Sequence, residues 1–250
     1  MNKYITNIVL KKCPSTLLLT YKGSIVYGTQ KEGSDVDFMG ICFPPEESVF
    51  GLGKFEQQEF KETIRGVIYE GTIYSIQKFF RLAMNGNPNI IECLFVEPKH
   101  IIYKTEIGQK IIDIRNEFLS KKCYHSFTGY AYSQLMKLRY KKYKESHRKA
   151  EVEKYGYSLK NAYHLIRLLH MAIQILTEKD LTVLRPERSL LIAIRNGKYK
   201  VEEIEEMARV LKKQTTDAYI RSDLRYKCDY KKLNEILIKI MREYYNIFVP

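Results

Sequence analysis

The sequence predicts an α+β fold followed by an all-α half, on three observations. Short segments rich in β-branched and aromatic residues occur among helical patterns in the first hundred residues. From about Thr105 onward the apolar residues follow a helical period. The charge balance also changes: residues 1–110 carry 13 Lys and Arg against 12 Asp and Glu, and residues 111–250 carry 29 against 17. We therefore expect two domains, 1–108 and 109–250.

The first domain is expected to contain three strands, at residues 17–21, 36–42 and 67–74. Two consecutive prolines, Pro44 and Pro45, end the second strand. Ser75 suits the N-cap of a helix, and Asn87 with Pro88 suits the start of another. The apolar side of these helices is expected to consist of Ile76, Phe79, Phe80, Ala83, Ile91, Leu94 and Phe95.

The second domain is expected to be helical. Candidate helices span residues 105–116, 122–143, 158–178, 186–196, 201–221 and 229–245. Gly197 is a natural stop for the fourth of them, because glycine readily adopts the backbone conformation found just after a helix.

Composition excludes several classes of protein. No apolar run approaches the roughly 18 residues of a membrane-spanning helix, and the charged N-terminus has no signal-peptide core. The cysteines are odd in number and widely spaced, without a Cys-x-x-Cys pair, which argues against zinc and indicates reduced thiols in a cytoplasmic protein. They are Cys13, Cys42, Cys93, Cys123 and Cys228.

The most informative motif is Gly23-Ser24 followed by Asp35-Val36-Asp37. In a strand, Asp35 and Asp37 project from one face while their apolar neighbours pack on the other. Two carboxylates on one face repel each other unless a cation lies between them. Small residues at 23 and 24 let a phosphate approach backbone N–H groups. Metal beside phosphate is what nucleotidyl transfer requires.

On these residues the chain resembles the DNA polymerase beta-like nucleotidyltransferases. The longer match resembles their stand-alone bacterial and phage branch, which includes RNA-repair-associated, RlaP-like proteins. The resemblance covers roughly residues 15–100 and, more weakly, 155–200. The matching residues beyond the motif are Tyr27-Gly28-Thr29, Ser34, Tyr74-Ser75-Ile76, Lys78-Phe79, Gly86-Asn87-Pro88-Asn89 and Glu92.

The resemblance implies a nucleotidyltransferase-type mixed sheet in the first domain and an enzyme that uses two Mg²⁺ ions, with Mn²⁺ as the alternative. Asp35 and Asp37 would bind both ions. A nucleoside monophosphate would pass from an NTP, such as ATP, to a hydroxyl group. The basic second half favours RNA, such as a tRNA or a broken RNA end, as the acceptor, although a Lys-rich composition bias also explains the charge.

The family also implies a third carboxylate on a neighbouring strand, for which Glu70 is the candidate. The alternative for Glu70 is a solvent-facing edge-strand residue, with Glu59 and Glu62 as other choices. Ser24 would bind the β- or γ-phosphate, with Thr29 near enough to assist, whereas the alternative for Ser24 is a simple turn.

Two basic segments of the second domain are candidate binding surfaces. Lys160, His164 and Arg167 share one helix face at i, i+4 and i+7, and Lys-x-Ala-x-His-x-x-Arg recurs in similar proteins. They would bind triphosphate or RNA backbone; the alternative is a solvated basic face with a packed histidine. The second segment interleaves tyrosines with Lys137, Arg139, Lys141, Lys142, Lys144 and Arg148, and would bind nucleic acid unless it is a plain surface helix.

Two other functions stay open. The chain could be a binding module that retains the fold and binds nucleic acid without catalysing a reaction. It could also be an antitoxin-like nucleotidyltransferase that modifies a protein partner. Neither alternative involves a membrane.

Overall fold

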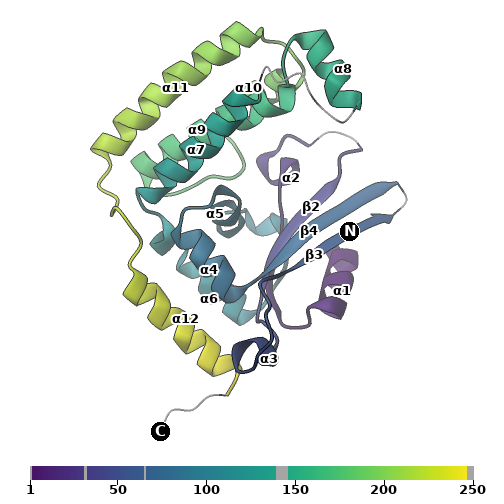
Figure 1. The fold of residues 1–250 in the computed structure, drawn as a ribbon, viewed down its shortest axis with the longest axis vertical. Helices are drawn as coiled ribbons and strands as arrows, with labels where there is room; N and C mark the ends of the chain where they lie inside the picture. Colours follow the sequence, from purple (N-terminus) through teal and green to yellow (C-terminus); the bar gives the residue numbers. More distant parts are fainter. Residues whose placement is uncertain (1, 31–32, 65, 139–145, 247–250) are drawn as a thin grey trace. The chain divides into compact units, whose positions relative to one another are not determined.

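The structure is a computed structural model that describes residues 2–30, 33–64, 66–138 and 146–246. It divides into two compact units (Figure 1). The sheet unit comprises Met1–Asn85, Asn89–Phe118 and Cys228–Pro250, and the helical unit comprises Gly86–Pro88 and Leu119–Lys227. The predicted α+β class is confirmed, because one unit combines a sheet with helices and the other is helical.

The sheet unit is built on a five-stranded mixed sheet in the order β3-β4-β2-β1-β5. Strands β2 and β4 are parallel, and the other neighbouring pairs are antiparallel. The predicted strands correspond to β1, β2 and β4, and β2 has the predicted limits. The strands are β1 Thr16–Tyr21, β2 Val36–Cys42, β3 Gln57–Ile64, β4 Val67–Ser75 and β5 Ile101–Lys104.

The two edge strands, β3 and β5, were not predicted from the sequence, for a physical reason. In β3, Phe60 is the one buried residue, so its sequence lacks the apolar pattern of a core strand. Pairing with β4 holds it as a strand, in register from Gln57 opposite Tyr74 to Ile64 opposite Val67. Strand β5 has only four residues and pairs with β1.

Helices cover both faces of this sheet. Helix α1 packs on one face, with Ile5 and Val9 fully buried, while α4, α5 and α6 lie on the other (Figure 1). Ser75 caps α4 as predicted, its hydroxyl accepting a hydrogen bond from the Lys78 amide at 3.3 Å. The helices are α1 Asn2–Lys12, α2 Ser24–Tyr27, α3 Glu46–Val49, α4 Ile76–Met84, α5 Pro88–Leu94 and α6 Glu106–Asp113, with 3₁₀ turns at Pro98–His100 and Arg115–Phe118.

The last helix, α12 (Tyr230–Tyr244), belongs to the sheet unit, so the observed units differ from the division at residue 108. Helix α12 packs against α4. The Tyr244 ring stacks on Phe43 with centroids 3.6 Å apart, and Lys232 Nζ lies 2.8 Å from Glu117 Oε1. These contacts join segments far apart in the chain, which a change in local charge balance does not reveal.

The helical unit is arranged around α9, against which α7, α8, α10 and α11 pack. Helix α7 ends at Met136, and the Leu138 carbonyl accepts a hydrogen bond from the Ser158 amide at 3.0 Å. Residues 139–143 of the predicted helix lie outside the described residues. Helix α8 was not predicted. The helices are α7 Lys122–Met136, α8 Ser146–Tyr155, α9 Leu159–Glu178, α10 Arg188–Arg195 and α11 Val201–Arg221.

Two features of the chain bear on the expectations about membranes and about cysteines. Within the described ranges, no helix combines the length and apolar character needed to cross a membrane. All five cysteines are buried, and none forms a disulfide.

Candidate nucleotidyltransferase site

The turn after β1 comes very close to β2 at the predicted motif. Gly23 has φ 70° and ψ −143°, a conformation that glycine adopts far more readily than other residues. A Cβ at this position would lie 2.8 Å from Asp37 Oδ2. The Lys22 amide also donates a 2.9 Å hydrogen bond to the Asp37 carbonyl oxygen. The structure therefore brings the small-residue turn and the second acidic residue so close together that a side chain at position 23 would collide with the carboxylate.

The two acidic residues of the motif occupy different positions on β2. Asp37 is half-buried within the strand, between Val36 and Phe38, which are 3% and 1% exposed. Asp35 is exposed and lies just before the strand. The predicted alternation is thus present at residues 36–38, and a common direction for the two carboxylates stays a prediction.

Glu70 lies beside Asp37, because β2 and β4 pair in parallel with these residues as direct partners. Partner residues on neighbouring strands project from the same face of a sheet. Glu70 is exposed, and its Oε2 lies 3.3 Å from Nζ of Lys61, its partner on β3. Lys61, Glu70 and Asp37 therefore follow one another across β3, β4 and β2. Glu70 has a cationic partner, Lys61, in the structure.

The donor chemistry of this region suits a hard divalent cation. Carboxylate oxygens are the preferred protein ligands of Mg²⁺, which needs few of them because water and substrate phosphates complete its shell. Any side chain at position 23 would collide with Asp37 Oδ2. Across the described part of the chain, no three His, Cys, Asp or Glu side chains gather as a metal-binding group. The assignment of Glu70 as third ligand stays a prediction.

Ser24 and Thr29 differ in their surroundings. Ser24 is half-buried and begins the single turn of α2. Thr29 is 2% exposed, and its amide donates a 2.9 Å hydrogen bond to the Ser24 carbonyl oxygen. This burial favours a role for Thr29 in supporting the turn over direct contact with a nucleotide.

A buried polar pair that the sequence analysis missed supports the same turn. The Tyr27 hydroxyl donates a short hydrogen bond to Glu92 Oε2, and the two residues are 3% and 2% exposed. Tyr27 belongs to α2 and Glu92 to α5. A glutamate inside the apolar run 90–95 was the available signal, because a buried carboxyl group needs a hydrogen-bonding partner.

The thiol of Cys93, the residue after Glu92, has low reactivity. The Cys93 Sγ lies 3.3 Å from Thr20 Oγ1, and burial raises the pKa of Cys93 to about 11. The thiol is therefore neutral at pH 7 and is a poor nucleophile.

Substituting Tyr27→Phe is expected to lower the free energy of unfolding by about 1–3 kcal/mol, because a buried carboxyl oxygen of Glu92 loses a donor. Chemical denaturation measures the change. Tyr132→Phe is the matched control, since Tyr132 is 56% exposed and its loss should change stability by less than about 0.5 kcal/mol. Equal stability of the two variants would contradict a supporting role for the Tyr27–Glu92 pair.

The predicted basic stripe on α9 is not uniformly exposed. Lys160 is exposed, His164 is half-buried, and Arg167 is 2% exposed with Nη1 3.0 Å from Met171 Sδ. Arg167 is therefore not part of a solvated face, because α9 is surrounded by other helices of its unit. Binding of phosphate by Lys160 and His164 stays a prediction, and the burial of Arg167 favours a structural role.

The second basic segment is mostly outside the described residues. Lys137 is exposed and follows the last residue of α7. Arg139, Lys141, Lys142 and Lys144 lie outside the described residues, and Arg148 lies in α8 with a side chain that is also outside them. Nucleic-acid contact by these residues stays a prediction.

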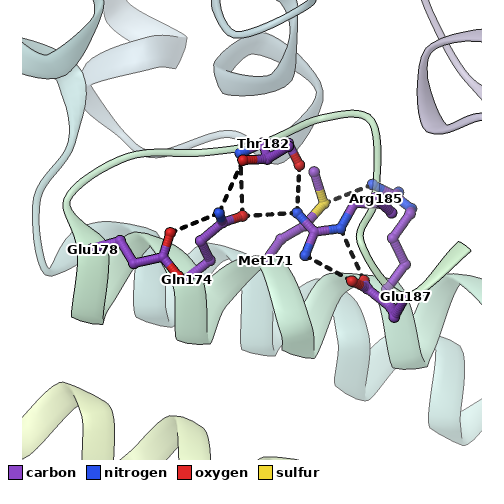
Figure 2. Close-up of polar contacts among 7 residues, drawn as sticks. Met171, Gln174, Glu178, Thr182, Arg185 and Glu187 are labelled. Carbon is purple, nitrogen blue, oxygen red and sulfur yellow. Dashed lines mark hydrogen bonds and ion pairs between the residues drawn. The ribbon is translucent and has the colours of Figure 1, made fainter.

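The end of α9 is held by a buried arginine that the sequence analysis also missed. Arg185 is 2% exposed, and its guanidinium makes two hydrogen bonds to the Glu187 carboxylate, at 2.8 and 3.1 Å. Its Nη1 also donates to Gln174 Oε1 at 2.9 Å and to the Thr182 carbonyl oxygen at 2.5 Å (Figure 2). These bonds fasten the connection between α9 and α10 to α9 itself.

Comparison with known proteins found a relative, a solved structure and a matching family model. The chain is 29% identical over 132 residues to an "Uncharacterized 38.9 kDa protein in nrdC-mobD intergenic region" of Enterobacteria phage T4, a match covering 49% of this chain and 38% of that protein. A solved structure of a nucleotidyltransferase-like protein from Exiguobacterium sibiricum aligns over 88% of this chain and 74% of its own, with 12% identity and a TM-score of 0.36. The sequence model of the family described as "RlaP: RNA repair pathway DNA polymerase beta family" matches residues 2–239. The chain therefore belongs to the RlaP family of DNA polymerase beta-like proteins.

Proposed function

We propose that this protein is a magnesium-dependent nucleotidyltransferase that moves a nucleoside monophosphate from an NTP to a hydroxyl acceptor on RNA. The observation that carries the proposal is the approach of Gly23 to Asp37, where a Cβ would meet Oδ2 at 2.8 Å. Membership of a nucleotidyltransferase family supports the reaction class. In the reaction, the acceptor oxygen attacks the α-phosphorus, the bond to the β-phosphate oxygen breaks, and pyrophosphate leaves.

Asp35 and Asp37 are the proposed ligands of the metal, with Glu70 as the third candidate. Divalent ions bound there would neutralise phosphate charge and lower the pKa of the attacking hydroxyl. The approach of Gly23 to Asp37 supports this assignment, because it brings a turn without a Cβ next to the carboxylate, where a phosphate could contact backbone N–H groups. Ser24 Oγ would donate a hydrogen bond to the β- or γ-phosphate. Lys160 and His164 would offset negative charge on the triphosphate or on RNA.

RNA is the favoured acceptor because of the excess of Lys and Arg after residue 110. Polyanion contact with such a surface is strongly salt-dependent. A broken RNA end or a tRNA terminus supplies the free hydroxyl that the reaction needs.

One observation favours a second function, nucleic-acid binding without chemistry. Glu70 pairs with Lys61 at 3.3 Å, and among the described residues no three acidic, histidine or cysteine side chains form a metal-binding group. A binding module of this kind would hold RNA but would not react with nucleotides.

Incubating the purified protein with Mg²⁺, each α-labelled NTP and total RNA distinguishes these functions. We expect label to enter RNA from at least one NTP, to depend on Mg²⁺, and to stop when EDTA is added. Label on a protein in added cell lysate would instead identify a protein-modifying transferase. If RNA binds but no acceptor is labelled with any NTP, the transferase proposal is wrong and the binding module stands.

A further inference from the structure

Two cysteines from different elements meet at the end of the sheet away from Asp37. Cys13 directly follows α1, and Cys42 is the last residue of β2. Thr16 is the direct cross-strand partner of Cys42. A tight turn brings residue 13 back to Thr16, whose amide and hydroxyl both donate to the Cys13 carbonyl oxygen, at 3.2 and 2.6 Å. The turn and the strand pairing together place Cys13 beside Cys42.

Both cysteines line the same cavity, which has a volume of about 460 Å³. The remaining wall includes Lys12, Phe43 and Tyr245. Cys13 and Cys42 are 5% and 1% exposed, so the cavity is their route to small molecules. A cavity of this volume has room for molecules the size of water. The other three cysteines do not line this cavity.

The two sulfur atoms differ in acidity because they interact. A hydrogen bond with Cys42, assisted by the charge of Lys12, lowers the pKa of Cys13 despite burial. The same hydrogen bond and burial raise the pKa of Cys42. Because the thiolate is the nucleophilic form, Cys13 is the sulfur suited to attack first. Once Cys13 is oxidised, its hydrogen bond no longer raises the pKa of Cys42, so Cys42 can follow as the second nucleophile.

We propose that Cys13 and Cys42 form a redox-reactive pair that hydrogen peroxide converts into an intramolecular disulfide. The Cys13 sulfur attacks one peroxide oxygen, the O–O bond breaks, and water leaves, which produces a sulfenic acid on Cys13. The Cys42 sulfur then attacks the sulfenic sulfur, the S–O bond breaks, and a second water leaves. Two thiols are thereby oxidised while one peroxide is reduced to two waters.

The proposed disulfide would join the end of α1 to the end of β2. It would also lie beside Phe43, on which Tyr244 of the last helix stacks. The pair stands apart from the proposed transfer chemistry, because Asp37 lies at the opposite end of β2. The proposal therefore does not depend on the proposed nucleotidyltransferase activity.

Peptide mapping of the full chain tests this assignment without any substitution. The reduced protein is exposed to stoichiometric hydrogen peroxide, alkylated under denaturing conditions, digested and analysed by mass spectrometry. We expect one linked peptide pair containing Cys13 and Cys42, lighter by two hydrogen atoms and restored by dithiothreitol. Its formation should be at least about tenfold faster than oxidation of Cys93, Cys123 or Cys228.

Serine variants separate the two steps. In Cys42→Ser, Cys13 should stop at a sulfenic acid that dimedone traps, whereas Cys13→Ser should leave Cys42 unoxidised. Cys93→Ser is the matched control and should form the link at the rate of the unsubstituted protein. Any of four results would overturn the proposal: uniform oxidation of all five cysteines, a link between two chains, a different pairing, or no reaction. If a variant does not fold, the peptide map of the unsubstituted protein decides the question.

Discussion

Replacing Asp35 and Asp37 together by Asn is expected to reduce nucleotide transfer by about 10³-fold or more. Asparagine keeps the size of aspartate but removes the negative charge that would bind a divalent ion. Charge stabilisation by metal is worth several kcal/mol in the transition state, and each 1.36 kcal/mol corresponds to a factor of ten in rate. Transfer of label from an α-labelled NTP to RNA measures the loss.

The same double variant should retain RNA affinity, because the proposed RNA-binding residues lie elsewhere in the sequence. It should also fold, since removing two neighbouring negative charges relieves repulsion. Asp113→Asn is the matched control: Asp113 is exposed on α6 and accepts a hydrogen bond from Gln109 at 2.6 Å, away from the motif. Undiminished transfer by the double variant would reject the catalytic assignment of both aspartates.

Substituting Glu187→Gln is expected to lower the free energy of unfolding by about 3–5 kcal/mol. The Arg185 and Glu187 side chains are only 3% and 14% exposed, so the substitution leaves a buried guanidinium without its counter-charge. The hydrogen bonds from Arg185 to Gln174 and Thr182 would remain but cannot replace a charge (Figure 2). Urea denaturation followed by circular dichroism measures the change, with the dependence on urea compared between variants.

A surface pair in the same unit provides the control for this prediction. Glu206 also accepts two hydrogen bonds from an arginine, Arg209, at 2.8 and 2.6 Å, but the two side chains are 59% and 71% exposed. Glu206→Gln should therefore leave the urea midpoint almost unchanged, because water solvates both groups. If the two variants were equally stable, the burial of Arg185 would not be the source of its contribution.

Elements with a strong local signal were predictable from the sequence. Strand β2 and helix α11 have the predicted limits, since each has a clear apolar pattern and a definite boundary. Ser75 caps α4 as predicted because the side chain and backbone groups that interact are only three residues apart. The motif around Gly23 and Asp35 was recognisable for the same reason: its spacing is a property of the chain.

Elements held by distant partners were not predictable in this way. Strand β3 has a polar sequence and becomes a strand by pairing with β4. Helix α12 was predicted as a helix at residues 229–245, but its packing within the sheet unit depends on α4 and Phe43, which are remote in sequence. Just after α7, Leu138 accepts a hydrogen bond from the amide of Ser158, a partner that is distant in the sequence.

The amino-acid sequence by itself determined the fold class, the main core strands and helices, and the family motif, because these depend on local periodicity and spacing. Only the tertiary structure decided that Gly23 approaches Asp37, that Glu70 is the in-register neighbour of Asp37, and that Arg167 is buried. It also placed Tyr27 against Glu92 and Cys13 beside Cys42. Strand register and side-chain burial depend on which surfaces meet when the chain folds, and these are long-range consequences of packing.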